Sequence, residues 1–152
     1  MPLVLENPKS LTEWIGREIG VTDWFAMTQD LIRQFAEVTG DRQWIHIDQE
    51  RALRDSPFQT TIAHGFLTLS LLSRFIRQVL EIRSVRLTVN YGLNRVRFPA
   101  PVRAESRIRG HFVLQSVKEV SSAIEAVFEV KIEVEASAKP CCVAEWVLRY
   151  YS

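Results

Sequence analysis

The segment from residue 65 to residue 80 constrains the fold more than any other, because drawn as a helix it is apolar around most of its circumference. Its sequence is GFLTLSLLSRFIRQVL. The polar side chains that remain fall on one stripe, which consists of Ser70, Ser73, Arg74, Arg77 and Gln78. A helix with so little polar surface has to be covered by other elements on most sides. We therefore predict one long helix over Gly65–Leu80 that is wrapped by a sheet.

The second half of the chain supplies strands for that sheet. Four stretches are rich in β-branched and aromatic residues, and they cover residues 85–98, 106–117, 123–136 and 141–151. In the third stretch, AVFEVKIEVE alternates apolar and charged positions, which is typical of a sheet with one face in solvent. Long antiparallel strands around one buried helix define an α+β architecture. A chain of 152 residues is expected to form a single domain over residues 1–152.

The first half of the chain is predicted to hold shorter elements. Thr28 is placed to cap a helix whose apolar residues recur at helical spacing until Gly40 ends it. Three further elements are expected around this helix: a helix over Pro8–Ile15 capped by Ser10, a strand over Trp24–Met27, and a polar helix over Asp48–Arg54.

The composition narrows the class of protein. Hydrophobic residues make up 47% of the chain and charged residues 24%, which is typical of soluble globular proteins. No apolar run reaches the length needed to cross a bilayer, and the start MPLVLENPKS does not resemble a secretion signal. A cytoplasmic location with no membrane partner is therefore expected. The adjacent Cys141 and Cys142 are expected to be reduced thiols without a function.

The net charge of +1 conceals an arginine-rich middle of the chain. Residues 74–109 hold two glutamates and nine arginines, namely Arg74, Arg77, Arg83, Arg86, Arg95, Arg97, Arg103, Arg107 and Arg109. Such a cluster could receive the phosphates of a substrate such as coenzyme A, although solvated strand and helix faces explain individual arginines equally well. Nucleic acid is not expected as a partner, because the whole chain is nearly neutral and has no basic motif studded with aromatic residues.

A carboxylate and an imidazole follow the predicted helix end at Gly40. In the stretch FAEVTGDRQWIHIDQERA, Asp41 comes directly after the helix and His46 follows after four further residues. The two groups held close together can act as general acid and base. Each also has an ordinary explanation, because Asp41 can cap the loop and His46 can be a hydrogen-bonded loop histidine.

A second motif, IAHGFLTLS, opens the predicted long helix. The first N–H groups of a helix have no acceptor within it, so the N–H of Gly65 could bind a developing oxyanion. Ser70 lies about a turn and a half further on, where it either orients Asp41 through a hydrogen bond or is an ordinary helix serine. His64 either lines the site or fixes the entry of the helix.

A metal site is not expected from these residues. Asp41, His46 and Asp48 are the nearest candidate ligands, and their spacing matches no known type of metal site. We therefore expect no metal and no other cofactor.

The two motifs together resemble the MaoC-like, (R)-specific enoyl-CoA hydratases of the hotdog-fold superfamily. NYGLNRVRFPAPV and SAKPCCVAEW resemble the nodulation protein N-like branch of that family. The resemblance implies a hotdog fold, a homodimer with an extended sheet, and a substrate tunnel near the interface. It maps the catalytic pair of the family onto Asp41 and His46, and the helix entry onto His64 and Gly65.

The loop between the catalytic pair departs from the family pattern. Many hydratases have Asn-Pro there, whereas this chain has Gln43 and Trp44. The substitution leaves the acid and the base in place but changes the expected shape of the loop.

The activity implied by the resemblance is reversible addition of water to trans-2-enoyl-CoA, or to a carrier-protein thioester, to give the (3R)-3-hydroxyacyl product of fatty acid metabolism. Two other classes remain open. A hotdog thioesterase typically needs a carboxylate on or beside the central helix, and no Asp or Glu lies between His64 and Glu81. A non-catalytic acyl-thioester-binding subunit is expected where part of the dyad is lost, whereas here both members are present.

Overall fold

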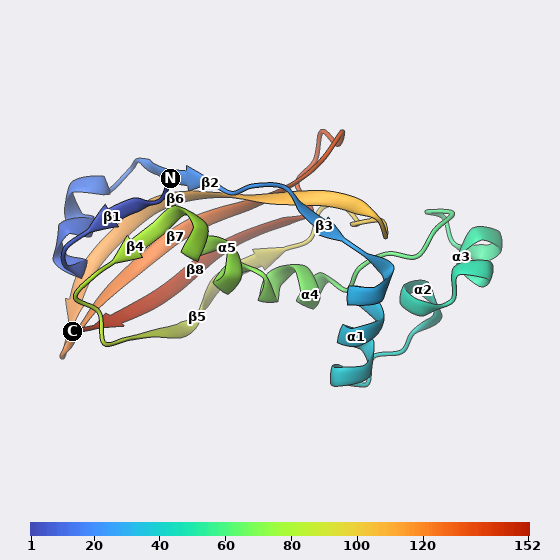
Figure 1. Ribbon diagram of the computed structural model, residues 1–152, viewed down its shortest axis with the longest axis horizontal. Helices are drawn as coiled ribbons and strands as arrows, with labels where there is room; N and C mark the ends of the chain where they lie inside the picture. The colour runs from blue at the N-terminus through green and yellow to red at the C-terminus, as the bar shows by residue number, and fades with distance from the viewer.

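The computed structural model describes residues 1–152 and shows a long antiparallel sheet with helices along one face (Figure 1). The body of the sheet consists of three neighbouring strands, which are β6 (Ser106–Val120), β7 (Ala123–Val134) and β8 (Cys142–Tyr151). Strand β5 (Leu87–Arg97) pairs with β8 and forms one edge. At the other edge, β2 (Glu18–Val21) and β3 (Phe25–Met27) both pair with β6.

Two consecutive helices, α4 (Gly65–Ser70) and α5 (Leu72–Val79), lie against the sheet (Figure 1). Their buried side chains join those of the inner sheet face in one apolar core, which includes Leu67, Phe75, Ile76, Phe112, Phe128 and Trp146. The polar stripe of the helical segment, from Ser73 to Gln78, stays exposed on the opposite side. The hotdog fold and the α+β class predicted from the sequence are therefore confirmed.

The prediction of one continuous helix over Gly65–Leu80 was wrong in one detail. The helix is interrupted at Leu71 and ends at Val79. The hydroxyl of Ser70 donates a hydrogen bond to the Leu67 carbonyl at 2.7 Å, and the N–H of Leu71 bonds instead to Thr68 at 3.2 Å. A serine that bonds back to its own helix competes with the backbone ladder, so Ser70 accounts for the break.

The structure adds two short strands that the sequence did not reveal and changes the type of one predicted helix. Strand β1 (Leu3–Leu5) pairs in parallel with β4 (Leu80–Ile82), which directly follows α5. Between β1 and β2 lies a 3₁₀ helix, η1 (Pro8–Trp14), where an α-helix capped by Ser10 was predicted. The cap is Asn7, whose side chain accepts a hydrogen bond from the Ser10 N–H at 3.3 Å.

Three helices project beyond the end of the sheet (Figure 1), and they are α1 (Gln29–Thr39), α2 (Trp44–Ile47) and α3 (Gln49–Asp55). As predicted, Thr28 caps α1 by accepting a bond from the Leu31 N–H at 3.2 Å. Gly40 ends α1 with a φ of 78°, a left-handed conformation that favours glycine. The one-turn helix α2 was not predicted, because Trp44–Ile47 is too short to show a period.

The arginine-rich middle does not form one free surface. Several of its guanidinium groups bind carboxylates on neighbouring elements, with the pairs Arg83–Glu6, Arg107–Glu135 and Arg109–Glu133. Others remain unpaired and lie elsewhere on the chain, as described below. The paired arginines are explained by these ion pairs, and phosphate binding by the unpaired ones stays a prediction.

Cys141 and Cys142 are both free and buried, as expected. Burial raises the pKa of Cys141 to about 12 and that of Cys142 to about 11, so both thiols stay protonated at neutral pH. No helix in the structure has the length and apolar character needed to span a membrane.

Candidate active site

The left-handed turn at Gly40 and the single turn of α2 bring Asp41 and His46 beside the entry of α4. One nitrogen or carboxylate oxygen from each of Asp41, His46 and His64 lies within 4.8 Å of the other two. These side chains share a cavity of about 300 Å³ whose lining is Phe35, Thr39, Asp41, His46, His64, Gly65, Phe66 and Phe98. The structure thus brings together four of the five site residues predicted from the sequence.

The ring of His46 is buried and held in one tautomer. Its Nδ1 lies 2.7 Å from the carbonyl oxygen of Ile62, which can only accept a hydrogen bond, so Nδ1 carries the proton. In the neutral ring, Nε2 then carries a free lone pair. Burial is the largest influence on the ring and lowers the pKa of His46, against the opposing effects of the Ile62 carbonyl and Asp41. The structure therefore favours a neutral His46 ring whose Nε2 lone pair is free.

His64 links the two members of the predicted dyad. Its ring stacks on that of His46 with centroids 3.7 Å apart and an angle of 21° between the planes. Its Nε2 donates to the backbone carbonyl of Asp41 at 2.9 Å, and Phe35 packs nearby with its centroid at 4.9 Å. The Nδ1 of His64 is buried without a hydrogen-bond partner. This residue therefore fixes the loop of Asp41 and the plane of His46 at once.

Gly65 begins α4 at the edge of this cavity. The preceding His64 is the N-cap but makes no side-chain capping bond, and its carbonyl oxygen accepts from the N–H groups of Leu67 and Thr68. The N–H of Gly65 has no acceptor in the chain. A Cβ at this position would lie 3.2 Å from the ring of Phe98, so glycine lets that ring pack over the start of the helix.

Ser70 is the predicted site residue that the structure does not bring to the others. Its hydroxyl bonds to Leu67 rather than to Asp41. It lines a different cavity, on the side of α4 that faces β5.

A buried polar network holds the backbone of His46, and it was not predicted from the sequence. The side-chain amide of Gln29 donates to the backbone carbonyl of His46 at 2.8 Å, and its oxygen accepts a bond from the hydroxyl of Thr61. Both residues are buried, and Thr61 precedes Ile62, the residue that holds the His46 ring. No signal in the sequence could have found this network, since its partners lie far apart along the chain.

Asp41, His46 and His64 are also close enough together to be considered as metal ligands. The two imidazole rings are stacked nearly parallel, however, so their in-plane lone pairs do not converge on one point as tetrahedral coordination requires. Asp48 does not belong to the group, because it is the N-cap of α3, where its side chain accepts a bond from the Arg51 N–H at 3.0 Å. The arrangement suits a bound water better than a metal ion.

Known proteins resemble this chain over most of its length. The family model described as "MaoC like domain" matches residues 10–136. The chain is 47% identical to 3-hydroxyacyl-thioester dehydratase Z of Mycobacterium tuberculosis over 146 residues, which cover 95% of this chain and 96% of that protein. It is 44% identical to nodulation protein N of Rhizobium leguminosarum over 135 residues, covering 88% of this chain and 84% of the relative.

A solved structure supports the fold. The R-hydratase PhaJ1 of Pseudomonas aeruginosa superimposes with a TM-score of 0.74 at 22% identity, covering 91% of this chain and 82% of that one. Fold, site and sequence together define an enzyme of the hydratase and dehydratase class. The chain belongs to the MaoC-like family, and the resemblance inferred from its motifs is confirmed.

Proposed function

We propose that the protein is an (R)-specific enoyl-CoA hydratase, which reversibly adds water to a trans-2-enoyl thioester to give a (3R)-3-hydroxyacyl thioester. The observation that carries this proposal is the convergence of Asp41, His46 and the free N–H of Gly65 on one cavity. The 3-hydroxyacyl-thioester dehydratase Z to which the chain is 47% identical carries the name of the same reaction in reverse.

Asp41 and His46 would hold the attacking water between them. The neutral His46 ring offers the Nε2 lone pair and the Asp41 carboxylate offers an oxygen, so both protons of one water can be bonded. We assign the role of base to Nε2, because the Nδ1 proton is already committed to the Ile62 carbonyl. The water oxygen attacks C3 of the substrate while His46 removes one of its protons.

The N–H of Gly65 would stabilise the charge that this attack creates. When the C3–O bond forms, the electrons of the double bond move toward the thioester oxygen, which becomes an enolate. A backbone donor fixed at a helix start stabilises such an oxygen without reorganisation. His46 then returns its proton to C2, so that hydrogen and hydroxyl from one water add to the same face.

Two other activities fit the structure less well. No acidic residue is present on α4 or α5 to activate water at a thioester carbonyl, as a hotdog thioesterase typically requires. A subunit that only binds acyl thioesters needs no acceptor pair at a shared cavity. The geometry of the site therefore favours the hydratase over both alternatives.

We also propose that the protein acts as a homodimer joined through β5. This strand is an edge of the sheet, and it exposes several large apolar side chains, which are Leu87, Val89, Tyr91 and Leu93. Open strand edges invite pairing, and a twofold pairing of β5 with its copy would extend the sheet. Sedimentation of the wild type and of Leu93→Lys tests the dimer, since a charge in the interface should release monomers, whereas Val38→Lys on exposed α1 should not.

The activity is tested by mixing the purified protein with trans-2-butenoyl-CoA and following the loss of the conjugated chromophore. Chiral analysis of the product should give the (3R) alcohol. Release of free thiol would identify a thioesterase instead. Binding without either change would leave only the acyl-thioester-binding subunit.

A further inference from the structure

A second cavity lies farther along the helical segment, between α5 and the strands β5 and β8. Its volume is about 390 Å³. The side chains that form its apolar part include Ile76, Leu80, Ile82, Val85, Trp146 and Leu148. Arg77 on α5 and Arg86, just before β5, complete the lining together with a few uncharged polar residues. No acidic side chain lines this cavity, which we call the Arg77–Arg86 pocket.

Shared lining residues relate the Arg77–Arg86 pocket to the candidate active site through one intermediate cavity. A cavity of about 410 Å³ beside α4 shares Ser73, Asn90 and Trp146 with this pocket. The same intermediate cavity shares Phe66 with the cavity that holds Asp41 and His46. The three cavities are therefore neighbours in a row along α4 and α5.

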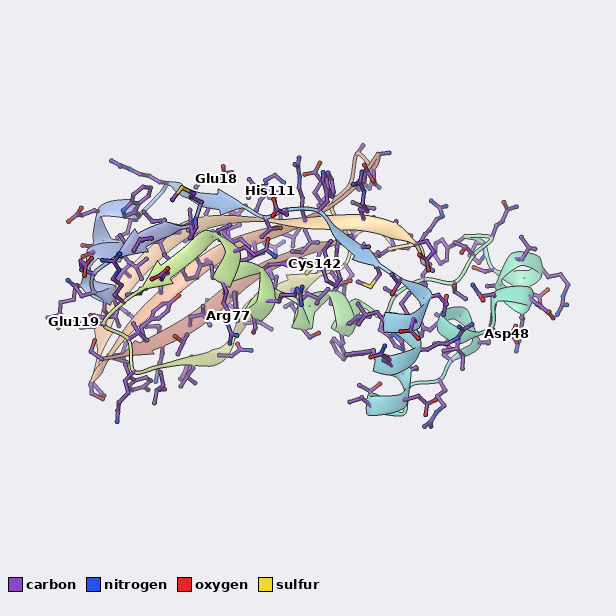
Figure 2. All side chains as sticks on the ribbon, viewed as in Figure 1. Glu18, Asp48, Arg77, His111, Glu119 and Cys142 are labelled. Carbon is purple, nitrogen blue, oxygen red and sulfur yellow. The ribbon has the colours of Figure 1, made fainter.

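The two arginines differ from most others in the chain because their guanidinium groups have no partner. Every other arginine except Arg95 forms an ion pair, a side-chain hydrogen bond or a contact with an aromatic ring. Arg77 projects from α5 on the side of β5 (Figure 2). Both arginines are exposed at the rim of one apolar pocket, and their guanidinium groups are free to bind an anionic oxygen group.

Tyr150 adds a hydrogen-bond donor to the same pocket. Its side chain is only 5% exposed and lines the same pocket. Its hydroxyl makes no hydrogen bond within the chain, and it is not fully enclosed, since His64 Nδ1 is the one fully buried side-chain atom without a partner. The hydroxyl is therefore free to bond to a group in the cavity. Burial raises the pKa of Tyr150, which keeps the hydroxyl protonated and able to donate.

We propose that the Arg77–Arg86 pocket binds an anionic oxygen group of the acyl thioester, either a carboxylate at the far end of the acyl chain or a phosphate of coenzyme A. The apolar side chains contact the methylene groups, while the guanidinium groups and the Tyr150 hydroxyl bind the oxygens. The proposal rests on the proposed function for the identity of the ligand as an acyl thioester. It adds a selectivity for substrate charge that the dyad itself cannot supply.

The test measures binding rather than turnover. Calorimetry measures the affinity for two series of saturated acyl-CoA ligands at several chain lengths. In one series the far end of the acyl chain is a methyl group, and in the other it is a carboxylate. At a chain length that reaches the pocket, the carboxylate ligand should bind the wild type at least about tenfold more tightly. Arg77→Met and Arg86→Met should each remove most of that difference, and Tyr150→Phe should reduce it by a smaller factor.

The matched control is Arg95→Met, because Arg95 is also unpaired but lines a different cavity. Pantetheine thioesters, which lack the nucleotide phosphates, separate the two sources of charge. If the arginine variants weaken every CoA ligand but no pantetheine ligand, the bound group is a phosphate of coenzyme A. If Arg77→Met and Arg86→Met match Arg95→Met with all ligands, the proposal is overturned.

The proposed hydratase activity can fail separately. Failure to hydrate trans-2-butenoyl-CoA, with arginine-dependent binding of the saturated ligands intact, would reject the hydratase but keep the anionic site. Normal hydration without any effect of the two arginines on binding would keep the hydratase and reject the anionic site.

Discussion

The side-chain amide of Gln29 donates a hydrogen bond to the backbone carbonyl of His46 at 2.8 Å. Through Thr61, the same amide is joined to the segment whose next residue, Ile62, fixes the His46 ring. The backbone and the ring of His46 are thus positioned from one buried side chain. Since catalysis depends strongly on the placement of reacting groups, Gln29 acts as a positioning residue for the proposed base.

Replacing Gln29 by Ala should impair both stability and activity. The carbonyl of His46 would lose its buried donor, which costs about 1–3 kcal/mol in the free energy of unfolding. The turnover number should fall more than the KM changes, because the base is misplaced while the cavity remains. Urea denaturation and steady-state kinetics measure the two effects. Gln34→Ala on the exposed side of the same helix is the control, and equal effects of both substitutions would contradict the role of Gln29.

Asp41→Asn and His46→Gln should each lower turnover by about 10²–10⁴-fold while the protein remains folded. The reason is that Asn lacks the negative charge of the carboxylate and Gln lacks a basic nitrogen that can take up the proton of the water. Because both residues act on the same water, the double variant should be little worse than the more damaged single one. Initial rates with an enoyl-CoA and thermal unfolding curves measure this. A single variant with nearly normal rates would rule out the dyad.

The dependence of kcat/KM on pH should report the lowered pKa of His46. Burial favours the neutral ring, so activity should persist below pH 6.5, the ordinary value for histidine, and fall only as pH drops through the lower folded pKa. The free energy of unfolding also falls as the pH falls. Below about pH 6.5 the histidine of the unfolded state binds a proton more readily than His46 of the folded state. His46 therefore favours the folded state less and less as pH falls from the unfolded pKa to the folded one.

This pH dependence can be assigned to His46 directly. An NMR titration of the ring should give a pKa below 6.5 in the wild type, and a still lower one in Asp41→Asn, since Asp41 raises this pKa. A midpoint above 6.5 would contradict the dominant effect of burial on this ring.

Gly65→Ala should slow hydration without unfolding the protein. The new Cβ would lie 3.2 Å from the Phe98 ring, so the ring or the start of α4 has to shift by a few tenths of an ångström. Displacement of a preorganised donor by this amount should lower turnover about tenfold. The second substitution Phe98→Leu should restore part of the rate by making room. If Gly65→Ala is as active as the wild type, the rate does not depend on the close packing of Phe98 against the start of α4.

Local patterns in the sequence predicted most elements of the fold. The alternation in AVFEVKIEVE and the apolar segment after His64 indicated sheet and buried helix, because burial leaves a period in the sequence. The caps at Thr28 and Gly40 could also be predicted, because a helix cap depends on the residue type at the helix end. The break at Leu71 was not, since it depends on whether Ser70 bonds to Leu67 or to a group outside the helix.

The sequence by itself determined the residue types of the site, the fold that carries them and the family to which the chain belongs. It placed Asp41 beyond a helix end and Gly65 at a helix start, both of which follow from local backbone chemistry. Only the tertiary structure decided how the segments meet: the tautomer of His46, its stacking on His64, the Gln29 network and the Arg77–Arg86 pocket. These features join residues far apart in the chain, and their geometry is set by packing, which leaves no periodic trace in the sequence.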